Sequence, residues 1–325
     1  MGSFYVIGGQ QRAPRPLRAG NRNWNGYERG VIMRVDPETH DIKTCVTYVS
    51  PPEVCAADDP AITLQASTIQ DSMLYTCTQT EVLIYALPSF ERLGYLSLPC
   101  FNDVHHVRPT PEGNLLVANA GLEMVVETTP AGELRRVWNV LGEDPWGRFS
   151  REVDYRRIET KPHRAHPNYV FTVGDEIWAT RFHQGDAICL TSPEKRIQIS
   201  SERIHDGVLH DGRLYFTVVS GSIVVANPQT LQVEQVINLN SMHAEGTLLG
   251  WCRGIFIDGD KLWVGFSRIR PTKFRENVSW VMHGFKHVLP TRVACYDLSR
   301  RRCVVEIDLE PTGLGAVYSV LPTLD

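Results

Sequence analysis

The amino-acid sequence predicts an all-β protein, a six-bladed β-propeller, on three observations. A short strand pattern recurs along the chain, each copy stands within a group of four strand patterns, and unpartnered strand patterns stand at the two ends. Repeats of about 40 to 50 residues with four strands each are typical of propellers. The 325 residues are therefore expected to form a single propeller domain over 1–325.

The recurring pattern is clearest in the second strand of each repeat. Turn residues such as Pro-Glu-Gly-Asn or Asp-Gly precede a short segment rich in β-branched and aromatic residues, which is typical of a strand that follows a tight turn. The five copies are 73–78, 115–119, 177–182, 214–219 and 262–267. Third and fourth strand patterns follow each copy, so five blades of four antiparallel strands are expected.

The two ends of the chain predict the sixth blade. A strand of the innermost type stands at 316–323, and strands of the second, third and fourth types stand at 4–9, 31–35 and 42–49. Pairing the C-terminal strand with the three N-terminal strands closes the ring and removes open sheet edges, which favour aggregation. We therefore expect six blades, with seven as the alternative.

Three insertions interrupt the repeat, at 10–30, 146–164 and 269–292. Loops of this length in a compact fold are usually functional or disordered. All three contain arginines and aromatic residues, which favours lids or rims beside a site over passive linkers.

Charge and cysteine content exclude several classes of protein. The net charge is −4 and the isoelectric point is near 6.3, so the basic footprint of a nucleic-acid-binding protein is absent. The eight cysteines are scattered without a Cys-x-x-Cys pair, which argues against a zinc ribbon or a disulfide framework.

The sequence also argues against a membrane protein. No apolar run approaches the ~18 residues of a membrane span, and the N-terminus lacks a charged segment followed by a long apolar one. We expect a cytoplasmic location.

Polar residues begin the innermost strand of several repeats. The segment NDVHHVRPTPEGNLLVAN at 102–119 contains His105 and His106, of which only one is expected to face the shared axis, because side chains alternate along a strand. Comparable positions in later repeats hold His166, His205 and Arg253. The remaining blades would contribute Gln65 or Ser67 and Tyr318 or Ser319. A ring of polar side chains around the axis is therefore predicted.

The ring predicts a metal site with His106, His166 and His205 as ligands. Three imidazoles from separate strands suit Zn, Fe, Mn or Cu, and a ligand set with open positions suits catalysis. Acceptors that fix the histidine tautomers are expected nearby, at Asp103, Asn168 and Asp206. His163 and His243 are possible further members of the site.

Arg253, His105 and Tyr318 are the predicted catalytic residues. An arginine directed into a propeller channel needs a negative partner. Either a small anionic substrate or a buried carboxylate such as Glu245 would satisfy Arg253.

Two segments carry a resemblance to known propellers. The segment at 102–119, followed by EMVVETTPAGELRRVWNV, resembles one blade of the arylsulfotransferase family. That resemblance implies a histidine that accepts sulfate transiently, and it would include His106. His166, His205 and Arg253 correspond to that family's residues only in type and blade. The last blade, which begins WCRGIFIDGDKLWVGFS, is similar to uncharacterised bacterial propeller proteins and implies no activity.

Three functions therefore remain open at the sequence level. The first is an enzyme of lyase, isomerase or oxygenase type, in which histidines hold a divalent metal that acts on a small anionic substrate. The second is a histidine-dependent sulfuryl or group transferase without metal. The third is a non-catalytic propeller that binds a small molecule or a protein, because the fold alone does not decide function.

Overall fold

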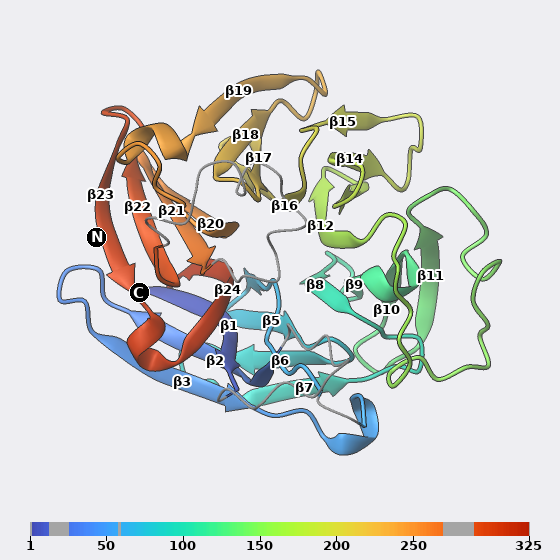
Figure 1. The fold of residues 1–325 in the computed structure, drawn as a ribbon. Helices are drawn as coiled ribbons and strands as arrows, with labels where there is room; N and C mark the ends of the chain where they lie inside the picture. Colours follow the sequence, from blue (N-terminus) through green and yellow to red (C-terminus); the bar gives the residue numbers. More distant parts are fainter. Residues whose placement is uncertain (1, 13–25, 58–59, 269–288, 325) are drawn as a thin grey trace.

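The computed structural model describes residues 2–12, 26–57, 60–268 and 289–324. Six four-stranded antiparallel sheets are arranged around a common axis as the blades of a β-propeller (Figure 1). The all-β, six-bladed prediction is confirmed. Among the described residues the only helical segments are short 3-10 turns at Pro52–Val54, Ala120–Leu122, Leu239–Met242 and Glu310–Thr312. No helix within these ranges is long and apolar enough to cross a membrane.

Five blades each use four strands that are consecutive in the chain. The first contains β4 (Thr68–Gln70), β5 (Met73–Cys77), β6 (Val82–Ala86) and β7 (Arg92–Leu96). The second contains β8 (Val104–Pro109), β9 (Leu115–Asn119), β10 (Met124–Thr128) and β11 (Leu134–Asn139). The third contains β12 (Pro167–Val173), β13 (Glu176–Arg181), β14 (Asp186–Cys189) and β15 (Arg196–Gln198). The fourth contains β16 (Ile204–His210), β17 (Arg213–Val218), β18 (Ser222–Ala226) and β19 (Val233–Asn238). The fifth contains β20 (Trp251–Asp258), β21 (Lys261–Ser267), β22 (Arg292–Asp297) and β23 (Arg302–Asp308).

The sixth blade joins the two ends of the chain. Its order is β24 (Leu314–Pro322), β1 (Phe4–Gln11), β2 (Tyr27–Val35) and β3 (Ile42–Tyr48). The pairing of β1 with β24 runs from Phe4 opposite Pro322 to Gln10 opposite Leu314, so the predicted closure is confirmed. Figure 1 shows the two termini near each other, and the backbone N–H of Thr323 donates to Ser3 O at 3.3 Å.

The predicted insertions differ in how they are built. Part of 10–30 is strand, because β1 extends to Gln11 and β2 begins at Tyr27, while 13–25 lies outside the described residues. The segment 146–164 contains turns and no strand or α-helix. Most of 269–292 also lies outside the described residues, and Arg292 is already the first residue of β22.

The apolar core lies between neighbouring blades. Each sheet buries both faces, so its strands contain longer apolar runs than a half-exposed sheet would. One cluster, for example, packs Phe4 and Val31 of the closing blade against Trp263 and Val293 of the preceding blade. The rings of Phe4 and Trp263 lie 4.6 Å apart between centroids. Burying side chains of this size stabilises the fold by about 1.5–3 kcal/mol each.

The innermost strands carry β-bulges near the axis. In five of them the register shifts and passes over one or two residues. The residues passed over are His105, Asn168, Asp206 with Gly207, Gly254, and Tyr318 with Gly315. A bulge redirects the side chains beside it, so simple alternation does not hold where these strands approach the axis.

Candidate functional site

A small polar cavity, here called the axial cavity, lies between the innermost strands. Its volume is about 10 Å³. The lining residues are Ala66, His105, Asn168, Tyr169, His205, Asp206, Arg253 and Tyr318. The structure thus brings together the three predicted catalytic residues, His105, Arg253 and Tyr318. The space suffices for about one water molecule, so an organic substrate does not fit there.

Arg253 is held by a histidine and an aromatic ring. Its Nη2 lies 2.9 Å from His205 Nε2, and its guanidinium carbon lies 4.5 Å from the centroid of the Tyr318 ring. Trp251 Nε1 also donates to His205 Nε2, at 3.1 Å, and His205 Nδ1 lies 2.7 Å from Asn168 Nδ2. Both ring nitrogens of His205 are therefore in contact with protein groups.

His106 lies in the packing between blades and does not line the axial cavity. Its ring is fully buried and stacks on Tyr169 with the centroids 3.6 Å apart. Nδ1 accepts the backbone N–H of Val170 at 3.2 Å, and Nε2 lies 3.0 Å from Thr68 Oγ1. Burial holds the pKa of His106 well below its ordinary value, so the ring is neutral.

The three predicted metal ligands do not gather at one point. Within the described part of the chain, His106, His166 and His205 do not form a group whose ligand atoms all lie within 4.8 Å of one another. The bulge at His105 explains why His106 does not reach the site, because it directs His105 and not His106 toward the axial cavity.

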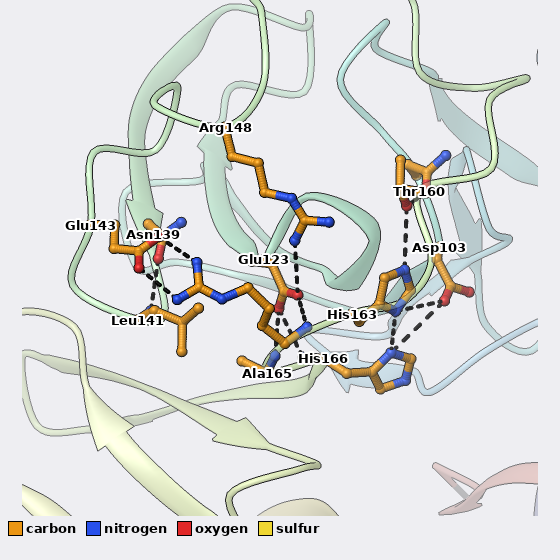
Figure 2. A network of polar contacts seen from close by, with 12 residues as sticks. Asp103, Glu123, Asn139, Leu141, Glu143, Arg148, Thr160, His163, Ala165 and His166 are labelled. Atoms are coloured by element: carbon orange, nitrogen blue, oxygen red, sulfur yellow. Dashed lines mark hydrogen bonds and ion pairs between the residues drawn. The ribbon is translucent and has the colours of Figure 1, made fainter.

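His166 instead forms a group with Asp103 and His163, here called the Asp103 cluster (Figure 2). The two Nδ1 atoms of the histidines lie 2.8 Å apart. Asp103 Oδ2 lies 3.7 Å from Nδ1 of His163 and 3.9 Å from Nδ1 of His166. His105 connects this cluster to the axial cavity, because its Nε2 lies 3.4 Å from Asp103 Oδ1.

The backbone around the cluster is fixed by a buried carboxylate. Glu123 is 1% exposed and accepts the backbone N–H groups of Arg164, Ala165 and His166, the last two at 2.9 Å (Figure 2). His166 itself has a φ of 58°, in the left-handed region. A non-glycine residue rarely adopts that conformation unless its surroundings impose it. Glu123 contributes to holding His166 in place, together with Phe182, whose backbone N–H donates to His166 O at 3.2 Å.

The charges of the cluster match those of a ligand set. Burial raises the pKa of Asp103, but the nearby His105 and His166 lower it more, so the net pKa is well below the ordinary value. Burial lowers the pKa of His163 and lowers that of His166 well below its ordinary value. An ionised carboxylate and neutral imidazoles are the forms that bind metal ions.

The donor atoms also fit a transition metal. Two imidazole nitrogens and one carboxylate oxygen suit Zn²⁺ or Fe²⁺, with further positions left open for a substrate. Thr160 Oγ1 lies 3.3 Å from His163 Nε2, and it also donates to Asn102 Oδ1 at 2.8 Å. Such a partner on the second ring nitrogen fixes the orientation of a ligating histidine.

A larger cavity, here called the basic cavity, adjoins the cluster. Its volume is about 200 Å³, and Asp103 and His163 form part of its wall. Arg156, Arg157 and Lys161 also line it. Arg156 is paired with Asp154 at 2.6 Å, and Lys161 with Glu159, which also lines the cavity, at 4.0 Å. Arg157 has no ion pair with any described residue. This cavity can therefore accept a small anion beside the cluster.

Asp103 and His163 were not identified as metal ligands from the sequence. Asp103 was expected only as a supporting acceptor and His163 only as a possible further member. The spacing His163-Arg-Ala-His166 is the signal that points to the pair, because it places two imidazoles on one short loop. The sequence contains no comparable signal for Asp103.

Comparison with known proteins supports the fold. No protein-family model and no curated protein matches the chain. A protein of unknown function from Bacteroides caccae is 13% identical over 100% of both chains, with a TM-score of 0.63. A structure titled as a nidogen/laminin complex is 9% identical over 98% of this chain and 97% of that one, with a TM-score of 0.57. The β-propeller domain of Cps50 (Swd1) from Myceliophteria thermophila is 12% identical over 87% and 81%, with a TM-score of 0.50. At these identities the likeness shows the fold alone, and the comparisons give the arylsulfotransferase resemblance no support.

Proposed function

We propose that the protein is a metal-dependent enzyme that acts on a small anionic substrate. Asp103, His163 and His166 would hold a divalent transition metal, and the substrate would occupy the basic cavity. One observation carries this proposal: the ligand atoms of these three residues lie within 4.8 Å of one another, and two of the residues form part of the wall of the 200 Å³ cavity.

This assignment retains His166 from the predicted ligands and replaces the other two. His106 and His205 each have both ring nitrogens in contact with groups outside a ligand set. The Nδ1 atoms of His163 and His166 instead lie 2.8 Å apart, at 3.7 and 3.9 Å from Asp103 Oδ2. The metal identity remains a proposal among Zn, Fe, Mn and Cu, and the donor set favours the first two.

The protein groups around the cavity have distinct roles in this proposal. When bound, the metal would polarise a carboxylate or carbonyl oxygen of the substrate. Arg157 and Lys161 would bind and orient the anion. His105, beside Asp103 and buried except for 9% of its surface, would hold or move a proton at Nε2. Lyase or isomerase chemistry fits these roles, and bound Fe would favour an oxygenase.

The metal-free alternative has less support. Sulfuryl transfer through His106 needs an accessible imidazole nitrogen. His106 is fully buried, and both of its ring nitrogens contact protein groups.

Metal analysis and titration test the proposal. We expect the protein purified without chelator to contain Zn or Fe, and the metal-free protein to gain thermal stability when that metal is added back. His163→Ala and His166→Ala should each weaken metal binding at least about tenfold. The control is His210→Ala, because His210 ends β16 and belongs to neither the cluster nor the wall of the basic cavity. With metal bound, small carboxylates or phosphate should raise the Tm further, and Arg157→Ala should remove that increment.

Two results would overturn the proposal. One is less than about a tenth of an equivalent of any transition metal together with no thermal shift on titration. The other is unchanged metal affinity in both histidine variants. In that case the 2.8 Å separation of the two Nδ1 atoms would represent an ordinary N–H···N hydrogen bond between neutral imidazoles.

A further inference from the structure

A second group of side chains that can bind metal lies on the outer side of the fifth blade. His243, Cys303 and Glu306 have ligand atoms that all lie within 4.8 Å of one another. We propose that this group, here called the rim cluster, binds a thiophilic divalent cation of the Zn²⁺ class. The inference is independent of the proposed function, because the rim cluster shares no residue with the Asp103 cluster.

A β-bulge brings two of these ligands to the same face of β23. Tyr296 pairs with Cys303 and Cys295 pairs with Val305, so Val304 is the extra residue. Residues three apart on a regular strand point to opposite faces. The extra residue reverses that relation, which lets Cys303 and Glu306 approach the same point.

The third ligand comes from the connection between two blades. His243 follows the 3-10 turn at Leu239–Met242, between β19 and β20. Its Nε2 lies 2.9 Å from the hydroxyl of Tyr296, and Tyr296 is fully buried. The hydroxyl orients the imidazole and leaves Nδ1 without a hydrogen bond to any described residue, as is usual for a histidine prepared to bind metal.

The other two ligands also have free donor capacity. Cys303 Sγ makes one long contact, 3.7 Å from the carbonyl oxygen of Val305. Glu306 Oε1 accepts Nε of Arg292 at 2.7 Å, which leaves Oε2 available. The Arg292 charge opposes a cation, but its guanidinium also donates to Leu249 O at 2.6 Å and faces the Phe266 ring. A thiolate formed on metal binding would add the negative charge that offsets it.

The donor set selects the metal class. A thiolate, an imidazole and a carboxylate with one open position suit Zn²⁺ and its spectroscopic substitute Co²⁺, whereas Mg²⁺ and Ca²⁺ prefer oxygen ligands alone. Because the ligands come from the blade connection and from an outer strand, a bound ion would fasten these two segments together and stabilise the native state.

Titration of the full-length protein with Co²⁺ tests this inference. A thiolate-to-cobalt charge-transfer band requires a sulfur ligand, so the Asp103 cluster, which has none, does not contribute. We expect the band in the wild-type protein, its loss in Cys303→Ser, and its displacement by Zn²⁺. Cys45→Ser is the matched control, since Cys45 is the other partly exposed cysteine and also lies on an outer strand, β3. It should leave the band unchanged.

Two further variants keep the test decisive if Cys303→Ser does not fold. His243→Gln and Glu306→Gln retain size and polarity, and each should weaken Co²⁺ binding about tenfold or more. Absence of the band in the wild-type protein would overturn the inference. A band that persists in Cys303→Ser, or that keeps its affinity in both glutamine variants, would also overturn it.

Discussion

Two adjacent histidines show how much the immediate surroundings decide what a residue can do. His105 and His106 share the same sequence context and the same blade. His106 is fully buried with both ring nitrogens in contact with protein groups. His105 lines the axial cavity, and its Nε2 has no hydrogen bond among the described residues. Of the two, His105 is therefore the one that faces both the axial cavity and the carboxylate of Asp103, whose Oδ1 lies 3.4 Å from its Nε2.

Substitution of Glu123 should show how far metal binding depends on the positioning of His166 by a residue that is not itself a ligand. Its carboxylate accepts three successive backbone N–H groups that lead into His166. In Glu123→Gln, an amide N–H₂ replaces one acceptor and faces these donors. We expect the free energy of unfolding to fall by about 1–3 kcal/mol, and metal affinity to fall about 10–100-fold.

Urea unfolding and metal titration measure the two effects of Glu123→Gln. Glu133→Gln is the control, because Glu133 is exposed and pairs with Arg135 on the surface. Loss of stability with unchanged metal affinity would show that Glu123 supports the fold without positioning His166.

At the scale of elements, strands were predictable and bulges were not. Strand patterns and turn residues gave five four-stranded blades, because apolar periodicity and turn chemistry are local properties. A bulge adds one residue without a required residue type: His105, Asn168 and Tyr318 have nothing chemical in common. The alternation rule therefore failed at the positions where the strands approach the axis.

The segment 146–164 shows a second limit of prediction. It contains no strand or α-helix, so no periodic pattern predicts the course of its backbone. Long-range contacts fix its course instead: Asn102 Nδ2 donates to the backbone carbonyl oxygens of Tyr155, at 2.6 Å, and Ile158, at 2.8 Å. These contacts, together with those of Glu123 to the backbone of residues 164–166, bring His163 to the Asp103 cluster.

A hairpin in the fifth blade should give stability a specific pH dependence. Asp297, at the end of β22, accepts hydrogen bonds from Lys261 Nζ, Ser299 Oγ and the backbone N–H of Arg300. The Lys261 hydrogen bond, followed by the other two, lowers the pKa of Asp297 from its ordinary value of 3.8. Since the folded pKa is the lower one, the ionised carboxylate stabilises the fold above pH 3.8, and this contribution is lost as the pH falls further.

We therefore expect Asp297→Asn to lower the urea midpoint at neutral pH, with a smaller difference from the wild-type protein as the solution is acidified below the ordinary pKa. Asp258→Asn is the control, because the Asp258 side chain is exposed and has no described hydrogen bond. A difference that stays constant with pH would mean that the substitution acts through packing and not through the charge.

At the scale of the whole molecule, stability depends on closing the ring. Every blade buries two apolar faces against its neighbours, so opening one seam exposes two faces at once. The seam between the fifth and the closing blade contains the Phe4 and Trp263 contact, and the pairing of β1 with β24 joins the two ends of the chain. The sequence predicted that pairing, because a strand of the innermost type stands near the C-terminus and the other three strands of a blade stand near the N-terminus.

Gly8 tests this closure most directly. It lies in β1 beside a register shift opposite β24, and a Cβ added there would stand 1.9 Å from the carbonyl oxygen of Ala316. Since the carbonyl oxygen belongs to the backbone, the clash can be removed only if β1 and β24 move apart. We expect Gly8→Ala to lower the free energy of unfolding by about 1–3 kcal/mol or more, and to speed amide hydrogen exchange in β1 and β24 before other strands. Gly2→Ala is the matched control, because a Cβ at Gly2 has nothing within 4 Å. Equal stability of the two variants, with unchanged exchange at the seam, would mean that the pairing of β1 with β24 contributes little to holding the ring closed.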